Sequence, residues 1–166
     1  MSLPDFPLIV IVGIKGTGKS TLAAELAKPW VPSAWYWSPS VEPALAGAGL
    51  RRIDPELGPP RRVAVVLDEV DFLLPSYHYP RDLPWVRSVC RQYRNRQSPL
   101  IVTAKRPPHV HPDLRREADV VYLGTLGGKD DQVQAVRDWG EQAAAAGHLD
   151  DKKLPAHRFV RIDRHL

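Results

Sequence analysis

Short runs of apolar residues recur along the chain, separated by segments in which the apolar positions have helical spacing. Four runs are almost continuously apolar, which predicts strands buried on both faces, as in a parallel sheet. These runs cover residues 8–12, 63–67, 100–103 and 120–123. A further short strand is predicted over 34–37, and the alternating pattern of 158–163 predicts a last, edge strand.

Helices are predicted between these strands. One follows the first strand and stops at Pro29, and residues 38–62, rich in proline and glycine, leave room for one short helix at 41–46 and an extended piece at 50–53. Asp82 is expected to cap the next helix. The apolar face of that helix consists of Trp85, Val86, Val89, Cys90 and Tyr93. A short helical turn is predicted over 112–117.

The last predicted helix follows Gly127-Gly128 and is expected to end at Gly147. Asp130 or Asp131 should cap it, and its inward residues should be Val133, Val136 and Trp139. Alternating strands and helices predict an α/β fold, a mostly parallel sheet with helices on both faces, in a single domain over residues 1–166. Right-handed crossovers bring the carboxyl ends of the parallel strands to one edge, where ligands bind in such sheets.

The turn after the first predicted strand has the pattern G-x-x-x-x-G-K-[ST] over residues 13–20. Glycines let backbone N–H groups curl around phosphate oxygens, and the following helix N-terminus adds partial positive charge. The pattern predicts a phosphate-binding P-loop rather than an ordinary glycine-rich turn. Its binding residues are Gly13, Lys15, Gly16, Thr17, Gly18, Lys19, Ser20 and Thr21. We expect Lys19 to reach the β- and γ-phosphates of ATP and Ser20 to ligate Mg²⁺.

Two acids, Asp68 and Glu69, directly follow the strand predicted at 63–67. Apolar residues followed by two acids fit a Walker B element. Asp68 is expected to hold Mg²⁺, directly or through water, beside Ser20. Glu69 lies one residue farther out, where it could orient and deprotonate an attacking water. The two motifs together predict ATP hydrolysis, with Asp71 as a spare carboxylate.

Composition and charge indicate what kind of partner the protein binds and where in the cell it is expected. The 166 residues carry a formal charge of +4, which favours an anionic partner. A single cysteine, Cys90, excludes an intrachain disulfide. The first residues lack a basic leader pattern, and the apolar run at 8–12 is too short to span a bilayer. We therefore expect a cytoplasmic protein without a transmembrane segment.

Charge is unevenly distributed along the chain. Residues 81–116 hold nine Lys and Arg against two Asp, a net charge of +7, whereas residues 128–151 hold two basic and six acidic residues, a net charge of −4. Complementary surfaces on one small domain suit head-to-tail packing, which closes into rings. The basic surface could equally contact a nucleic-acid backbone without reading sequence.

Residues 91–107, RQYRNRQSPLIVTAKRP, join a basic helix end to an apolar strand and a T-x-K-R-P motif. This arrangement resembles the HerA/FtsK-type P-loop ATPases, and residues 112–121 are similar to a later segment of that family. The resemblance implies an additional-strand, RecA-like fold. It also implies a homo-oligomeric ring, a hexamer or pentamer, that couples ATP hydrolysis to movement of double-stranded DNA.

The resemblance also assigns roles to particular residues. The family's polar sensor, usually glutamine, falls on Lys105. An arginine from a neighbouring subunit commonly completes such sites, and Arg94 and Arg96 match the family's basic helix end best. Three more arginines are held in reserve: Arg106, Arg115 and Arg116. Because the chain is compact, it looks most like viral genome-packaging ATPases, which would place it in the host cytoplasm or the virion, with a capsid or portal vertex as a further partner.

Two other functions stay open at this stage. A small-molecule or nucleotide kinase could use the same P-loop scaffold, although residues 124–131 are too short and glycine-rich for a lid. A phage assembly or secretion ATPase, similar to zonula-occludens-toxin-like proteins, would bind no DNA. Duplex-stimulated phosphate release, phosphate transfer to an acceptor and salt-dependent DNA binding distinguish the three.

Overall fold

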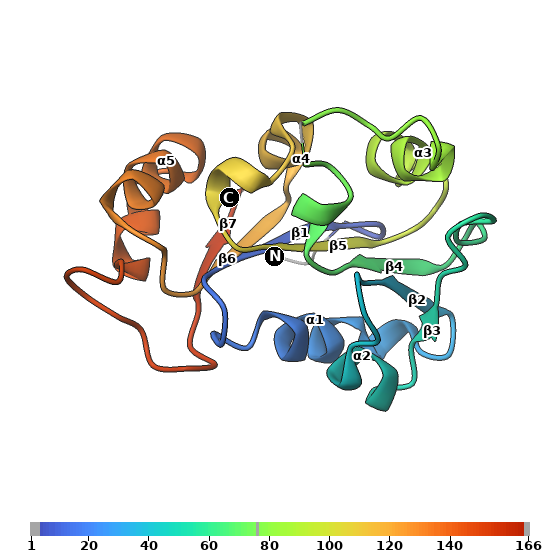
Figure 1. Cartoon of the computed structure of the whole chain (residues 1–166), viewed down its shortest axis with the longest axis horizontal. Helices are drawn as coiled ribbons and strands as arrows, with labels where there is room; N and C mark the ends of the chain where they lie inside the picture. The colour runs from blue at the N-terminus through green and yellow to red at the C-terminus, as the bar shows by residue number, and fades with distance from the viewer. Residues whose placement is uncertain (1–3, 76, 165–166) are drawn as a thin grey trace.

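A computed structural model describes residues 4–75 and 77–164 (Figure 1). Within these residues the strands form one seven-stranded sheet in the order β3-β2-β4-β5-β1-β6-β7. The strands are β1 (Leu8–Val12), β2 (Ala34–Trp37), β3 (Arg51–Arg52), β4 (Ala64–Leu67), β5 (Leu100–Ala104), β6 (Val120–Leu123) and β7 (Val160–Asp163). All neighbours pair in parallel except β7, which pairs antiparallel with β6 at the sheet edge. The predicted mostly parallel sheet is confirmed.

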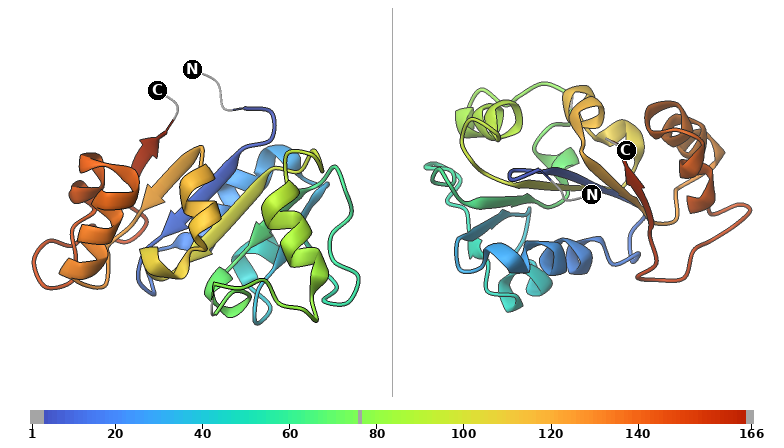
Figure 2. Two further views of the ribbon diagram at one scale, coloured as in Figure 1. Left: turned by 90° about the horizontal axis from the view of Figure 1, so that it is seen from above. Right: turned by 180° about the vertical axis from the view of Figure 1, so that it is seen from behind.

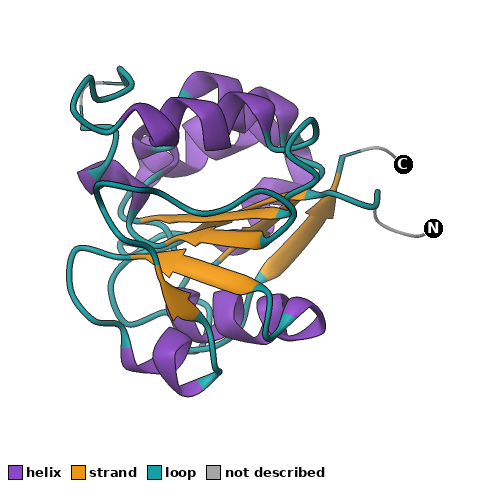
Figure 3. Ribbon diagram, turned by 90° about the vertical axis from the view of Figure 1, so that its right-hand side faces the viewer, coloured by secondary structure: helices purple, strands orange, loops and turns teal. Residues whose placement is uncertain are grey.

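Helices cover both faces of this sheet (Figures 1 and 3). One face carries α1 (Lys19–Ala27) and α2 (Pro43–Gly47), and the other carries α3 (Pro84–Gln92), α4 (Pro112–Glu117) and α5 (Lys129–Trp139). Short 3-10 turns are η1 (Lys28–Trp30), η2 (Val70–Phe72), η3 (Pro107–His109) and η4 (Glu141–Ala146). None of the helices in the described part of the chain is long and apolar enough to cross a membrane.

The continuous apolar strands are buried on both faces because each face packs on its own layer of helices. In β1, Leu8, Val10 and Val12 belong to the core under α3 and α5, while Ile9 and Ile11 belong to the core over α1 and α2. Burial of large aliphatic side chains at about 25 cal/mol per Å² makes these two cores the main stabilising contribution. The sheet is therefore a rigid platform for the loops at its edge.

Strand order places one strand, β5, between the strand that feeds the P-loop and the strand that precedes Asp68. This is the additional-strand arrangement, and its observation confirms the RecA-like type of sheet. The loops after β1, β4 and β5 leave from the same edge because these strands are parallel (Figure 2). The P-loop, Asp68-Glu69 and Lys105 accordingly meet there.

Two helix starts, one helix face and one helix end differ from the predictions. Asp82 caps nothing: the N-cap of α3 is Leu83, with no side-chain hydrogen bond, and Pro84 begins the helix. Similarly, α5 starts after Gly128 without a side-chain cap, because the carboxylate of Asp131 turns to Arg106 instead. Val133 is 60% exposed. The predicted single helix breaks at Gly140, whose φ of +88° ends α5 and begins η4.

Candidate active site

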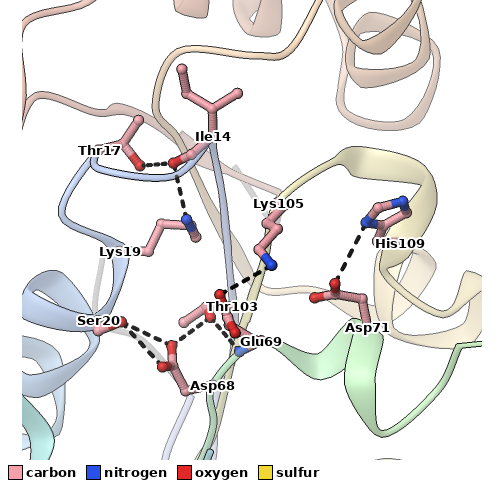
Figure 4. A network of polar contacts seen from close by, with 10 residues as sticks. All are labelled: Ile14, Thr17, Lys19, Ser20, Asp68, Glu69, Asp71, Thr103, Lys105 and His109. Atoms are coloured by element: carbon pink, nitrogen blue, oxygen red, sulfur yellow. Dashed lines mark hydrogen bonds and ion pairs between the residues drawn. The ribbon is translucent and has the colours of Figure 1, made fainter. Parts of the chain in front are cut away.

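The P-loop curls between the end of β1 and the start of α1 at the edge where the parallel strands end (Figure 4). Its backbone is tied to both neighbouring strands: the Gly13 N–H donates to the Ala104 carbonyl at 3.2 Å, and the Ile14 N–H donates to the Thr125 carbonyl at 2.9 Å. Gly16 and Gly18 have φ values of +84° and +89°, which a side chain would strain. The observed turn is thus one that only this glycine pattern forms easily.

Lys19 is held inside this turn. Its Nζ donates to the Ile14 carbonyl at 3.0 Å, and Thr17 Oγ1 donates to the same oxygen at 2.9 Å. Lys19 is 7% exposed, and this burial lowers the pKa of its ammonium, an effect opposed by the nearby carboxylates of Asp68 and Glu69. A buried ammonium that forms no ion pair within the described residues is well suited to bind an anion.

The remaining P-loop residues fall where the motif predicts. Lys15 and Gly16 are exposed at the tip of the loop, and Gly18 is the N-cap of α1. Ser20 and Thr21 lie in the first turn of α1. The N–H groups of that turn and the helix dipole together form the kind of backbone cradle that binds phosphate.

Asp68 faces Ser20 across this edge. Ser20 Oγ donates to both carboxylate oxygens of Asp68 at 3.1 Å, and Thr103 Oγ1 donates to Asp68 Oδ1 at 2.7 Å. Burial raises the pKa of the Asp68 carboxyl, and hydrogen bonds from Thr103 and Ser20 act in the opposite direction. A buried carboxylate beside a hydroxyl offers the hard oxygen ligands that Mg²⁺ prefers, the ion's remaining ligands being waters and phosphate oxygens. The pair fits Mg²⁺, although the described residues contain no cluster of three His, Cys, Asp or Glu side chains.

Glu69 leaves the strand end in a left-handed backbone conformation, with φ 53° and ψ 55°. Its N–H donates to Thr103 Oγ1 at 2.9 Å, so that one hydroxyl connects the backbone of Glu69 to the carboxylate of Asp68. A non-glycine residue in this region costs of order 1–3 kcal/mol and is common at functional sites. Sequence reasoning missed Thr103, whose signal was a hydroxyl residue at the end of the strand next to β4.

Lys105 lies beside Glu69, with its Nζ 3.3 Å from Glu69 Oε1. Both side chains are about one-third exposed, so the pair faces the open side of the edge. The same ammonium lies 4.9 Å from the ring centre of Phe72. Asp71 and His109 lie near this pair and approach each other to 3.8 Å, too far for a hydrogen bond (Figure 4). The structure therefore pairs the predicted base with the predicted sensor.

Arg94 and Arg96 lie at the opposite edge of the sheet, where the parallel strands begin. Arg94 Nη2 lies 3.0 Å from Asp119 Oδ1, and Asp119 also accepts the Leu8 N–H. Arg96 Nη2 donates to the Pro59 and Pro60 carbonyls at 2.7 and 3.1 Å. Neither arginine is brought to the P-loop of its own chain. The reserve arginines Arg106 and Arg115 form ion pairs with Asp131 and Asp138.

A segment near the end of the chain also touches the P-loop, which sequence reasoning did not anticipate. The His157 N–H donates to the Thr17 carbonyl at 3.0 Å, and its imidazole lies on Gly18 so closely that a Cβ there would be 2.3 Å from Nδ1. The segment is anchored where Thr125 Oγ1 accepts the Leu154 N–H at 2.9 Å. Gly18 thus allows both the turn and this contact.

The sequence matches no protein-family model, and no curated protein is significantly similar to it. Solved structures do share its fold. The genome-packaging NTPase B204 of Sulfolobus turreted icosahedral virus 2, in complex with ATPγS, is 15% identical with a TM-score of 0.69, over 96% of this chain and 93% of that one. B204 of Sulfolobus turreted icosahedral virus, a DNA-packaging ATPase, is 14% identical with a TM-score of 0.64, over 98% and 94%.

ATPases 2 and 3 of EssC from Geobacillus thermodenitrificans are 15% identical, with a TM-score of 0.61, over 96% of this chain and 38% of that one. At these identities the similarity establishes a common P-loop NTPase fold. The compact B204 chains match from end to end, whereas EssC contains this unit within a longer chain.

Proposed function

We propose that this chain hydrolyses ATP with Mg²⁺ and, as a ring of identical subunits, uses the energy to translocate or package double-stranded DNA. The observation that carries the proposal is the single cluster at the sheet edge in which Lys19, Asp68 and Glu69 converge (Figure 4). Two observations support the translocation or packaging of DNA. The chain shares the compact fold of B204, a genome-packaging NTPase, and residues 81–116 are strongly basic. A capsid or portal vertex would be the further partner in packaging.

Each group at the edge has a distinct task in hydrolysis. The cradle of residues 13–21 holds the phosphates, and Lys19 exchanges the Ile14 carbonyl for phosphate oxygens. Ser20 and Asp68 would hold Mg²⁺, which when bound neutralises phosphate charge. Glu69 accepts a proton from the attacking water, and its rigid attachment to the strand end through Thr103 keeps its carboxylate directed at the open edge.

Lys105 is proposed to act as the phosphate sensor. Its ammonium pairs with Glu69 in the structure, and a γ-phosphate would compete for that ammonium. We expect Lys105→Ala to lower kcat for ATP hydrolysis about a hundredfold with a smaller change in KM, because a charge aimed at the reacting phosphate is lost. Steady-state phosphate release measures both constants. Lys129→Ala, at an exposed lysine on α5, is the matched control, and wild-type turnover of Lys105→Ala would remove Lys105 from the mechanism.

Arg94 or Arg96 is proposed to complete the site of a neighbouring subunit. Arg94 is the better candidate, because its side chain is half exposed while Arg96 is engaged with two carbonyls. We expect inactive Arg94→Ala and inactive Lys19→Ala chains to recover ATPase activity when mixed, since some sites then combine an intact P-loop with an intact arginine. Arg94→Lys, which keeps a charge beside Asp119, controls for loss of that ion pair. Absence of recovery at every mixing ratio argues against shared sites.

ATPase activity with and without duplex DNA tests the proposed function as a whole. A DNA-translocating motor should release phosphate several-fold faster with duplex. A nucleotide kinase would instead transfer phosphate to an acceptor, and an assembly or secretion ATPase would hydrolyse ATP without responding to DNA.

A further inference from the structure

The structure divides the nine basic residues of segment 81–116 into those with a partner in the chain and those without. Four form close ion pairs, and Arg96 binds carbonyl oxygens. The four are Arg94, Lys105, Arg106 and Arg115. Among the described residues, the side chains of Arg81, Arg87 and Arg116 have no hydrogen bond or ion pair, and that of Arg91 has only a long contact of 3.8 Å to Asp113. The positive charge that is not neutralised within the chain therefore comes mainly from Arg81, Arg87, Arg91 and Arg116.

Three of these uncommitted arginines lie along one hollow surface. A cavity of about 480 Å³ is lined by His78, Tyr79, Pro80, Arg81, Pro84 and Arg87. A second, of about 410 Å³, is lined by Pro84, Arg87, Ser88, Arg91 and Gln92. Because the two share Pro84 and Arg87, we treat them as one surface, the α3 groove. Its lining includes three arginines and no carboxylate; Asp82, next to Arg81 in sequence, is exposed, and Asp113 lies 3.8 Å from Arg91.

The α3 groove lies on a rigid support. The opposite face of α3 is buried in the core through Trp85, Val86 and Val89, and Trp85 Nε1 donates to the Pro55 carbonyl at 2.8 Å. In the loop before α3, the Tyr79 ring stacks on His111 with ring centres 4.7 Å apart. Arg87 and Arg91 are four residues apart, so they project from the same side of the helix, about 6 Å apart along its axis. The helix backbone that carries Arg87 and Arg91 is thus held in place by the core before any partner arrives.

The position of the groove connects it to the candidate active site. After Asp68-Glu69 the chain forms η2 and then the loop that carries Arg81. This loop leads directly into α3. The described part of that connection contains no other strand or α-helix. A partner bound in the groove would therefore contact the segment that follows the carboxylates proposed for hydrolysis.

We propose that the α3 groove binds the phosphate backbone of duplex DNA through Arg81, Arg87 and Arg91. Guanidinium groups form bidentate, charge-assisted hydrogen bonds with phosphate, and a row of them binds backbone independently of sequence. Asp113, 3.8 Å from Arg91, is too distant to form a hydrogen bond that phosphate would have to replace. The inference rests on the proposed function in naming DNA as the partner. It adds which surface contacts DNA and which basic residues of segment 81–116 do not.

A second copy of the chain is the other partner that charge could suggest, through its acidic segment 128–151. Two of the six acids there are already neutralised: Asp131 is buried against Arg106, and Asp138 pairs with Arg115. The remaining four share the segment with Lys129 and Arg137, so these residues keep a net charge of only −2 to attract three arginines. Duplex DNA carries one negative charge per roughly 1.7 Å of helix axis, so it attracts these arginines more strongly than the acidic segment does.

The test compares Arg87→Gln/Arg91→Gln with the matched control Lys129→Gln/Arg137→Gln, which removes two exposed charges from α5. Binding of a fluorescent 30-base-pair duplex is measured by anisotropy at several salt concentrations, together with ATPase activity without DNA. We expect the groove variant to bind at least about tenfold more weakly at 0.1 M salt, with a salt slope smaller by about 2, because two phosphate contacts are lost. The control should bind within about twofold of wild type, and the ATPase activity without DNA should be unchanged in both.

A groove variant that binds DNA like wild type overturns the assignment while leaving DNA translocation intact. Equal losses in both variants also overturn it, since they would report net charge alone. Loss of self-association with unchanged DNA affinity would assign the groove to a second copy instead. If wild type hydrolyses ATP but binds no duplex, the groove and the DNA part of the proposed function both fail, and ATP hydrolysis stands. Arg87→Glu/Arg91→Glu, which adds repulsion, should weaken binding further than the glutamine pair.

Discussion

Replacement of Lys19 by alanine is expected to reduce ATP affinity at least about a hundredfold, below detection at micromolar protein. The side chain is buried in the P-loop, and its ammonium is held only by the Ile14 carbonyl, so it meets phosphate already desolvated and oriented. Removal of one member of a buried, hydrogen-bonded charge pair costs 2–5 kcal/mol, which corresponds to a 30- to 5,000-fold loss of affinity. Isothermal titration calorimetry with a non-hydrolysable ATP analogue measures the effect.

Lys15→Ala is the matched control for this prediction, because Lys15 belongs to the same loop but is exposed at its tip. Its affinity should fall by only a few-fold. Loss of Lys19 should not unfold the chain, since burial already disfavours its charge, as the lowered pKa of the ammonium indicates. A melting curve checks this point. Nucleotide affinity unchanged in a folded Lys19→Ala chain would refute the P-loop assignment.

The parts of the fold that could be predicted from the sequence are those in which local pattern and tertiary burial agree. Each continuous apolar run became a central strand because both faces of the sheet are covered by helices. The P-loop and Asp68-Glu69 follow two such strands, so their meeting at one edge required only that the sheet be parallel. The action of Arg94 or Arg96 at the site of a neighbouring subunit stays a prediction. The binding of Mg²⁺ by Ser20 and Asp68 also stays a prediction.

The errors have a common cause in long-range contacts. Asp131 has the sequence signature of a helix cap, but a cation 25 residues away, Arg106, takes its carboxylate. Val133 has helical spacing with Val136, yet it lies off the face that α5 buries, which consists of Asp131, Ala135 and Trp139. Thr103 is the first residue of the T-x-K-R-P motif, but that motif did not assign it a role at the site, and His157 belongs to no motif. Each becomes part of the site only because the fold places it beside Asp68 or Gly18.

Replacement of Glu69 by glutamine is expected to preserve ATP binding and to slow hydrolysis about a hundredfold or more. The side chain keeps its size, and the backbone hydrogen bond to Thr103, which sets the orientation of the strand end, does not involve the carboxylate. Only the ability to accept a proton from water is lost, and general base catalysis typically contributes 10²- to 10⁴-fold. Single-turnover hydrolysis of radiolabelled ATP, followed by measurement of the label retained on the protein, should show intact ATP trapped in the site.

Asp71→Asn is the matched control, because Asp71 is the next acid along the chain and faces His109 rather than Lys105. It should turn over ATP within a few-fold of wild type. The comparison also separates two roles for Glu69. If Glu69 only neutralised Lys105, then Lys105→Ala should restore hydrolysis to Glu69→Gln, since no unpaired ammonium would remain. If Glu69 is the base, the double variant stays as slow as Glu69→Gln, and wild-type turnover by Glu69→Gln alone would show that another group activates the water.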